Sequence, residues 1–141
     1  MAGAFFFLRL NDHVQYLRRI QATLEERDDF HGTCHTSCKL GRWLYGNGPE
    51  EASSVGTAAK EVFDALFEPH ERFHHASKKA LQKKQEGDMA GAEAAVTEMH
   101  QLSTILIHKL IKLDKLASRP QPGQDVEQRH HSDELLETSA N

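Results

Sequence analysis

Three histidines and one cysteine have the residue types and spacing that suit a metal ion. His70 and His74 are four residues apart, so on a helix their rings would lie one turn apart on nearly the same face. His13 falls within an apolar helical stripe, where a buried polar side chain needs a partner. Cys38 offers a thiolate, a strong zinc donor, at the predicted start of a short helix. A single zinc ion would satisfy these buried side chains together.

The same residues leave other interpretations open. A histidine on an apolar stripe is more often a hydrogen-bonded core residue than a ligand. Residues 70–74 also spell H-E-x-x-H, in which Glu71 would activate a zinc-bound water in a peptidase. The sequence predicts no strand to hold a peptide substrate. A hemerythrin-like di-iron bundle would recruit His100 and His108, but both lie off the apolar stripe and no inward carboxylate stands out.

Apolar periodicity predicts the helices that position these residues. The first long helix runs roughly over residues 5–27, and a short helix follows over 38–45 with Ser37 as its N-cap. The tight turn after it ends the short helix. A second long helix begins near Ser54 and must kink or restart at Pro69, because the proline ring removes a helical N–H.

Residues typical of helix starts and helix ends flank a third long helix. Gly87 suits the end of the preceding helix and Asp88 the N-cap of the next, and Pro120 prevents continuation. Three long helices and one short helix predict an all-α helical bundle over residues 1–117. Residues 118–141 hold five acidic and two basic side chains without apolar periodicity, which predicts an acidic tail with little fixed structure.

Composition narrows the choice of partner and compartment. The 141 residues suit one domain, and their formal net charge of −4 lacks the basic excess that nucleic acid or an anionic membrane surface requires. The apolar run at residues 4–8 is too short for a signal peptide, and no stretch predicts membrane insertion. We therefore expect a cytoplasmic protein. In a reducing compartment Cys34 and Cys38 are more often metal ligands or redox thiols than a disulfide pair.

Taken in order, the motifs resemble the chemoreceptor zinc-binding (CZB) domain family. That pattern is a histidine followed three residues later by an aromatic or large apolar residue, then C-x-(apolar)-G-x-(aromatic or apolar), then H-x-x-x-H. The sequence matches it with His13 and Tyr16, with residues 38–43, and with His70 and His74. Singly the motifs are short, whereas the ordered set is fairly specific.

The resemblance covers residues 6–116 and implies a helical bundle with a closed zinc site. The implied zinc ligands are His13, Cys38, His70 and His74. Gly41 would allow close packing of the short helix, Trp43 would fill the core, and Tyr16 would pack against or support the site. His31 and His35 would lie in the outer part of the site or face solvent.

The resemblance also implies a function in bacterial signalling. CZB domains are homodimerising sensory modules attached to chemoreceptors and diguanylate cyclases, where zinc occupancy or oxidation of the cysteine changes the output. We therefore expect a zinc-binding regulatory protein, a homodimer without catalytic activity, in chemotaxis or cyclic-di-GMP signalling. The 141 residues contain no recognisable receptor or cyclase segment, so we expect the output to pass to an unidentified signalling partner. Cys34 would either resolve an oxidised Cys38 as a disulfide or serve as a small loop residue, the more frequent role.

Overall fold

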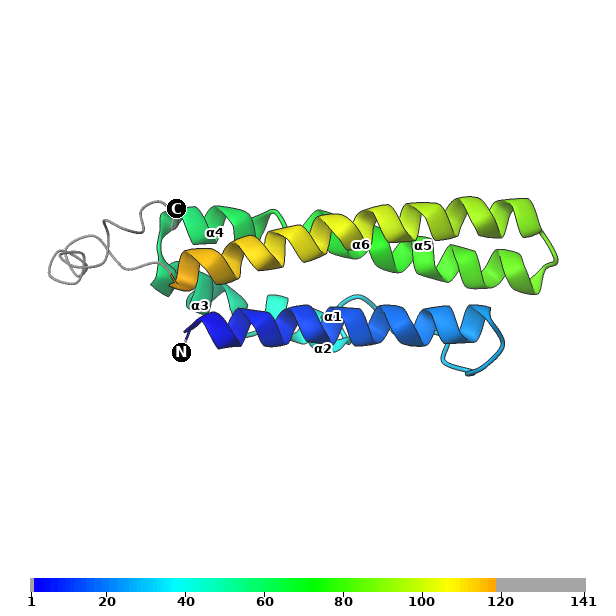
Figure 1. Cartoon of the computed structure of the whole chain (residues 1–141), viewed down its shortest axis with the longest axis horizontal. Helices are drawn as coiled ribbons and strands as arrows, with labels where there is room; N and C mark the ends of the chain where they lie inside the picture. Colours follow the sequence, from blue (N-terminus) through cyan, green and yellow to red (C-terminus); the bar gives the residue numbers. More distant parts are fainter. Residues whose placement is uncertain (1, 119–141) are drawn as a thin grey trace, which may run out of the picture.

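Helices are the only regular elements in the computed structural model, which describes residues 2–118 (Figure 1). In chain order they are α1 (Ala2–Leu24), α2 (Lys39–Leu44), α3 (Gly48–Val55), α4 (Thr57–Asp64), α5 (Phe67–Gln85) and α6 (Met89–Ser118). The predicted all-α helical bundle is confirmed. The predicted acidic tail lies outside the described residues, except for Ser118 at the end of α6. Within the described part, no helix is long and apolar enough to span a membrane.

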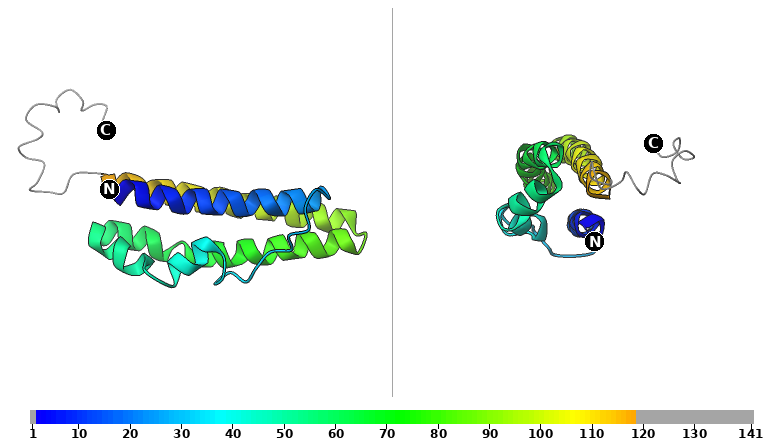
Figure 2. Two further views of the ribbon diagram at one scale, coloured as in Figure 1. Left: turned by 90° about the horizontal axis from the view of Figure 1, so that it is seen from below. Right: turned by 90° about the vertical axis from the view of Figure 1, so that its left-hand side faces the viewer.

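The helices occupy the four corners of an elongated bundle. Seen end-on in Figure 2, α1, α6, the α4 and α5 pair, and the α2 and α3 pair each take one corner. The helix α6 packs along both α5 and α1, and its C-terminal end lies beside the start of α1, so the two run antiparallel (Figure 1). The segment between α1 and α2 crosses the bundle and brings α2 against α1. Four segments distant in sequence thus share one core.

The apolar stripes predicted from periodicity face that core. In α6 the residues of the apolar stripe are buried: Ala92, Ala95, Met99, Leu102, Leu106, Leu110 and Leu113. In α1, Phe6, His13 and Ile20 are buried, and in α5 so are His70 and Phe73. Histidines therefore occupy core positions on two different helices.

The structure corrects the predicted number and bounds of the short helices. The long helix predicted from Ser54 is two helices, α4 and α5, which break before Pro69 and not at it. Pro69 is the third residue of α5, where the N–H that it lacks would have no helical partner in any case. The helix α3 was not predicted, because Gly48 and Pro49 read as a stop signal; Pro49 instead starts the helix from its first turn. The first helix ends at Leu24, earlier than expected.

Candidate metal centre

Three of the four predicted ligands converge in the core. The side chains of Cys38, His70 and His74 each offer one donor atom, and these atoms all lie within 4.8 Å of one another. All three residues are buried. Cys38 Sγ lies 3.3 Å from His70 Nε2, and the two imidazole centroids are 4.7 Å apart. We call these three residues the donor cluster.

The start of α2 positions the thiol. Cys38 is the N-cap of α2, and its sulfur accepts a hydrogen bond from the backbone N–H of Gly41 at 3.2 Å. The predicted N-cap, Ser37, is therefore wrong by one residue. Sulfur takes the capping position that a serine oxygen usually fills, so the amide end of the helix faces the sulfur and stabilises negative charge on it.

Gly41 allows that approach. A Cβ at this position would collide with the backbone carbonyl of His35, so only glycine lets the first turn of α2 lie against the preceding loop. The Cys38 S–H also points to the His35 carbonyl oxygen at 3.7 Å. Trp43, on the same short helix, is buried against Phe6 and Phe63. The predicted structural roles of Gly41 and Trp43 agree with this packing.

A hydrogen-bond network fixes the orientation of the His74 ring. His74 Nδ1 donates to the carbonyl oxygen of Thr33 at 3.1 Å, since a carbonyl can only accept. The Tyr16 hydroxyl accepts from the Thr33 N–H at 2.9 Å and lies 3.3 Å from the same ring nitrogen. With the proton held on Nδ1, the lone pair of Nε2 remains for a metal ion. Histidine ligands in metal sites usually have such an outer partner.

His13 is buried nearby but does not belong to the donor cluster. Its Nε2 lies 2.9 Å from the hydroxyl of Ser103 on α6, and both residues are 2% exposed. Its ring packs edge-on against Phe73, with 4.7 Å between centroids. The role of His13 as fourth ligand stays a prediction.

Burial keeps the imidazoles neutral. Burial, together with the repulsion that a second imidazolium charge nearby would cause, lowers the pKa of His13 and of His74 to about 4, and that of His70 to about 3. Neutral imidazole is the form that binds metal. Burial raises the pKa of the Cys38 thiol, and the Gly41 N–H opposes that rise.

The donor cluster fits zinc by chemistry and by spacing. One thiol and two neutral imidazoles form a set of nitrogen and sulfur ligands. Such a set binds zinc in preference to hard cations. In a tetrahedral zinc site a sulfur and a nitrogen ligand stand about 3.6 Å apart, close to the 3.3 Å between Cys38 and His70. Among residues with described side chains, no aspartate or glutamate belongs to the donor cluster. The cluster therefore suits zinc and offers no bridging acids for a di-iron centre.

The residues of the alternative interpretations lie elsewhere. Glu71 is exposed on α5, although the histidines on either side of it in the H-E-x-x-H segment are buried. His108 is exposed, and His100 pairs with Gln21 at 3.2 Å. Cys34 is exposed, with its sulfur 3.2 Å from the Thr36 hydroxyl. None of the four alternative side chains, Glu71, His100, His108 and Cys34, belongs to the donor cluster.

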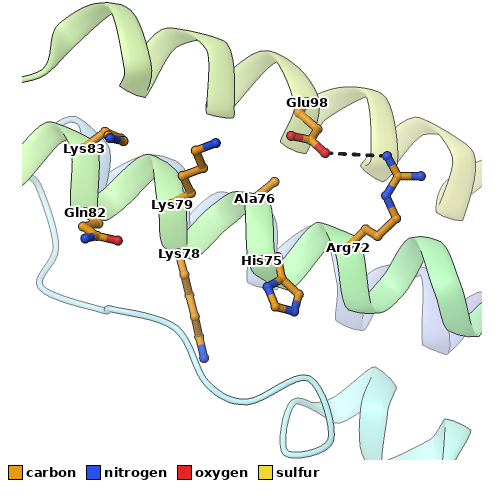
Figure 3. A pocket seen from close by; sticks show the side chains of 8 residues that line it. All are labelled: Arg72, His75, Ala76, Lys78, Lys79, Gln82, Lys83 and Glu98. Atoms are coloured by element: carbon orange, nitrogen blue, oxygen red, sulfur yellow. Dashed lines mark ion pairs between the residues drawn. The ribbon is translucent and has the colours of Figure 1, made fainter.

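A groove of about 520 Å³ on α5 and α6 is also separate from the donor cluster. It is lined by Arg72, His75, Ala76, Lys78, Lys79, Gln82, Lys83 and Glu98. Figure 3 shows Arg72 reaching across to Glu98, an ion pair of 3.6 Å between the two helices. The groove is mainly cationic, and none of its residues belongs to the donor cluster.

Two residues near the site were not predicted from the sequence. Thr33 acts through its backbone, which no side-chain pattern reveals. Ser103 did leave a signal, because it lies four residues after Met99 and three before Leu106, on the buried stripe of α6. A small polar residue on such a stripe indicates a buried hydrogen bond.

Comparison with known families agrees with this geometry. The model of a family described as chemoreceptor zinc-binding domain matches residues 13–81. The match begins at His13 and includes all three residues of the donor cluster. No curated protein and no solved structure matched the chain.

Proposed function

Because the chain belongs to the chemoreceptor zinc-binding domain family, we propose that it is a zinc-dependent sensory protein of bacterial signalling. The family is a zinc-binding signalling family. The observation that carries the proposal is the convergence of the Cys38, His70 and His74 donor atoms within 4.8 Å. Together with His13, they would close a tetrahedral site on protein ligands alone. Zinc would then connect helices that are distant in sequence, so that its occupancy changes their packing.

The two cysteines provide a matched test of the zinc site. Cys38→Ala removes a buried donor, whereas Cys34→Ala removes an exposed thiol outside the donor cluster. We expect tag-free wild type and Cys34→Ala to hold one zinc per chain after dialysis, and Cys38→Ala to hold much less. Equal zinc content in all three proteins would rule out the site.

We propose that the protein is regulatory and not an enzyme. A site closed by four protein ligands leaves no position for a reactive water. Glu71, the only acid within the H-E-x-x-H segment, is exposed. Glu71→Gln is expected to leave zinc content unchanged and to abolish no activity. Hydrolysis of an unstructured protein such as casein by the zinc-loaded wild type, lost in Glu71→Gln, would establish the peptidase alternative.

The proposed signal is zinc level or oxidation of Cys38. A pocket of about 270 Å³ borders Cys38 and Tyr16 and is flanked by Arg19, Lys39 and Arg42. Hypochlorous acid reaching the thiolate there would take two electrons from sulfur, giving a sulfenic acid and chloride. Cys34 would then displace water from that sulfur and form a disulfide. We expect one equivalent of oxidant to release zinc from wild type, and mass spectrometry to locate the oxidation on Cys38.

The proposed assembly is a homodimer that acts on a chemoreceptor or a cyclic-di-GMP enzyme. Near the start of α1, Phe7 is 58% and Leu8 is 52% exposed, and Ile105 and Ile111 are exposed on α6. These apolar side chains support self-association of the α1 and α6 face. Light scattering should give twice the chain mass of 15.9 kDa. A two-hybrid screen against the receptors and cyclases of the source organism would test the partner.

A further inference from the structure

Ser103, on α6, contacts His13, the predicted fourth ligand of the candidate metal centre. The helix α6 contributes no member of the donor cluster, and Ser103 lies outside the family match at residues 13–81. Its hydroxyl nevertheless lies 2.9 Å from His13 Nε2 in the interior of the bundle. Because a buried imidazole and a buried hydroxyl each need a partner, this contact between α1 and α6 satisfies both groups.

The contact occupies a ring nitrogen that a metal ion would need. If the Ser103 hydroxyl donates to Nε2, the hydrogen bond uses the same lone pair that would bind zinc. If Nε2 carries the proton and donates to Ser103, it has no lone pair for zinc. In both cases Nε2 cannot hold Ser103 and zinc together. This competition agrees with the position of His13 outside the donor cluster.

Ser103 has another partner available when His13 leaves. Serine and threonine hydroxyls on helices donate to the carbonyl four residues earlier. On α6 itself, Thr104 donates to the His100 carbonyl at 3.0 Å and Ser118 to the Asp114 carbonyl at 2.9 Å. By rotating about one side-chain bond, Ser103 would reach the Met99 carbonyl in the same way. Releasing His13 therefore leaves no buried hydroxyl without a partner.

We propose that Ser103 is a positioning residue that competes with zinc for His13. Zinc loading exchanges the His13 to Ser103 hydrogen bond for a His13 to zinc bond through the same Nε2. The exchange removes a polar contact between α1 and α6 and ties α1 to α2 and α5. The contacts of α6, a helix that contributes no member of the donor cluster, therefore depend on whether zinc is bound. This inference rests on the proposed function, with His13 as the fourth ligand.

The test is the zinc affinity of Ser103→Ala in the full chain, measured by competition with a chromogenic chelator. Removing the competitor is expected to strengthen zinc binding several-fold. Thr104→Ala is the matched control, because it removes an exposed hydroxyl from the next position of the same helix. In a His13→Ala background, Ser103→Ala should change nothing. If His13 instead binds zinc through Nδ1 and keeps Ser103 as its outer partner, Ser103→Ala would weaken binding, which would overturn the proposal.

A second readout follows His13 directly. Long-range proton to nitrogen NMR spectra of the histidine rings should show zinc shifting the Nε2 resonance of His13, while hydrogen exchange near Ser103 changes in wild type but not in His13→Ala. An unchanged affinity in Ser103→Ala, or a zinc-shifted Nδ1, refutes the exchange. The result for Cys38→Ala separates the two claims. If that variant binds zinc like wild type, the proposed function fails; if it loses zinc while Ser103→Ala has no effect, only the exchange fails.

Discussion

At the scale of single residues, the two nitrogens of His74 have separate tasks. Nδ1 is held by the Thr33 carbonyl at 3.1 Å, so Nε2 is left with a lone pair. The Tyr16 hydroxyl supports this arrangement by accepting the Thr33 N–H at 2.9 Å. Because Thr33 acts through its backbone, Tyr16 is the residue at which the network can be tested by substitution.

Tyr16→Phe is expected to lower zinc affinity about tenfold, the usual cost of losing an outer partner of a histidine ligand. The ring stays in the core, so packing against Phe30 and Phe73 is retained. Tyr45→Phe is the control, because Tyr45 is 52% exposed. Chelator competition measures both variants. Equal affinities for Tyr16→Phe and wild type would show that Thr33 and His74 hold their geometry without the hydroxyl.

The neutral histidines predict the acid sensitivity of the metal-free protein. Folding lowers the pKa of His13 and His74 from 6.5 to about 4 and that of His70 to about 3. Between these pH values the unfolded chain therefore binds more protons than the folded chain. The free energy of unfolding falls as the pH drops from about 6.5 toward 4. Urea unfolding of EDTA-treated protein across this range checks the slope. A wild type equally stable throughout the range would contradict the buried, neutral state of these rings.

At the scale of elements, α2 is six residues long and carries the sulfur. An isolated helix of this length is unstable in water. Both its formation and its position therefore depend on packing against the rest of the bundle. Leu40, Gly41 and Trp43 provide that packing, and Gly41 fixes how closely the first turn approaches the loop before it.

Gly41→Ala is expected to lower the free energy of unfolding by about 1–3 kcal/mol, because the added methyl collides with the His35 carbonyl. The displaced first turn should also take Cys38 out of reach and reduce zinc content. Lys39→Ala, at an exposed position of the same helix, should do neither. Urea unfolding and metal analysis measure both effects. Retention of full zinc content by Gly41→Ala would mean that the sulfur does not depend on this close packing.

The sequence predicts the long elements better than the short ones, for a physical reason. Stripes with helical spacing identified α1, α5 and α6, because their apolar faces repeat over many turns. The helices α3 and α4 have two turns each, and Gly48 and Pro49 resemble a helix stop as much as a start. For the site, the i, i+4 histidine pair and the cysteine motif predicted the donor cluster. The partner of Ser103 and the hydrogen bonds of the Thr33 backbone could not be predicted, because they depend on how segments distant in sequence pack together.

At the scale of the whole molecule, the donor cluster joins segments that the chain separates. Cys38 and His70 are 32 residues apart, the first at the N-cap of α2 and the second on α5. A metal bound to both favours the folded arrangement only, because the unfolded chain has no such site. Metal binding and bundle stability should therefore change together.

Zinc at one hundred times its dissociation constant is expected to stabilise the protein by about 2.7 kcal/mol against urea. Magnesium at the same concentration should add nothing, since it prefers oxygen ligands. The stabilisation should disappear in Cys38→Ala and persist in Cys34→Ala. A zinc effect of the same size in Cys38→Ala would place the ion elsewhere, for example on exposed histidines.

X-ray absorption spectroscopy of the zinc-loaded protein at one equivalent tests the central claim most directly. The spectrum reports the atoms bound to zinc and their distances without assuming which residues supply them. We predict one sulfur at about 2.3 Å and three nitrogens at about 2.0 Å, with the sulfur contribution lost in Cys38→Ala and kept in Cys34→Ala. A shell of nitrogen and oxygen alone in the wild type would contradict the assignment of Cys38, His70 and His74 to a single zinc ion.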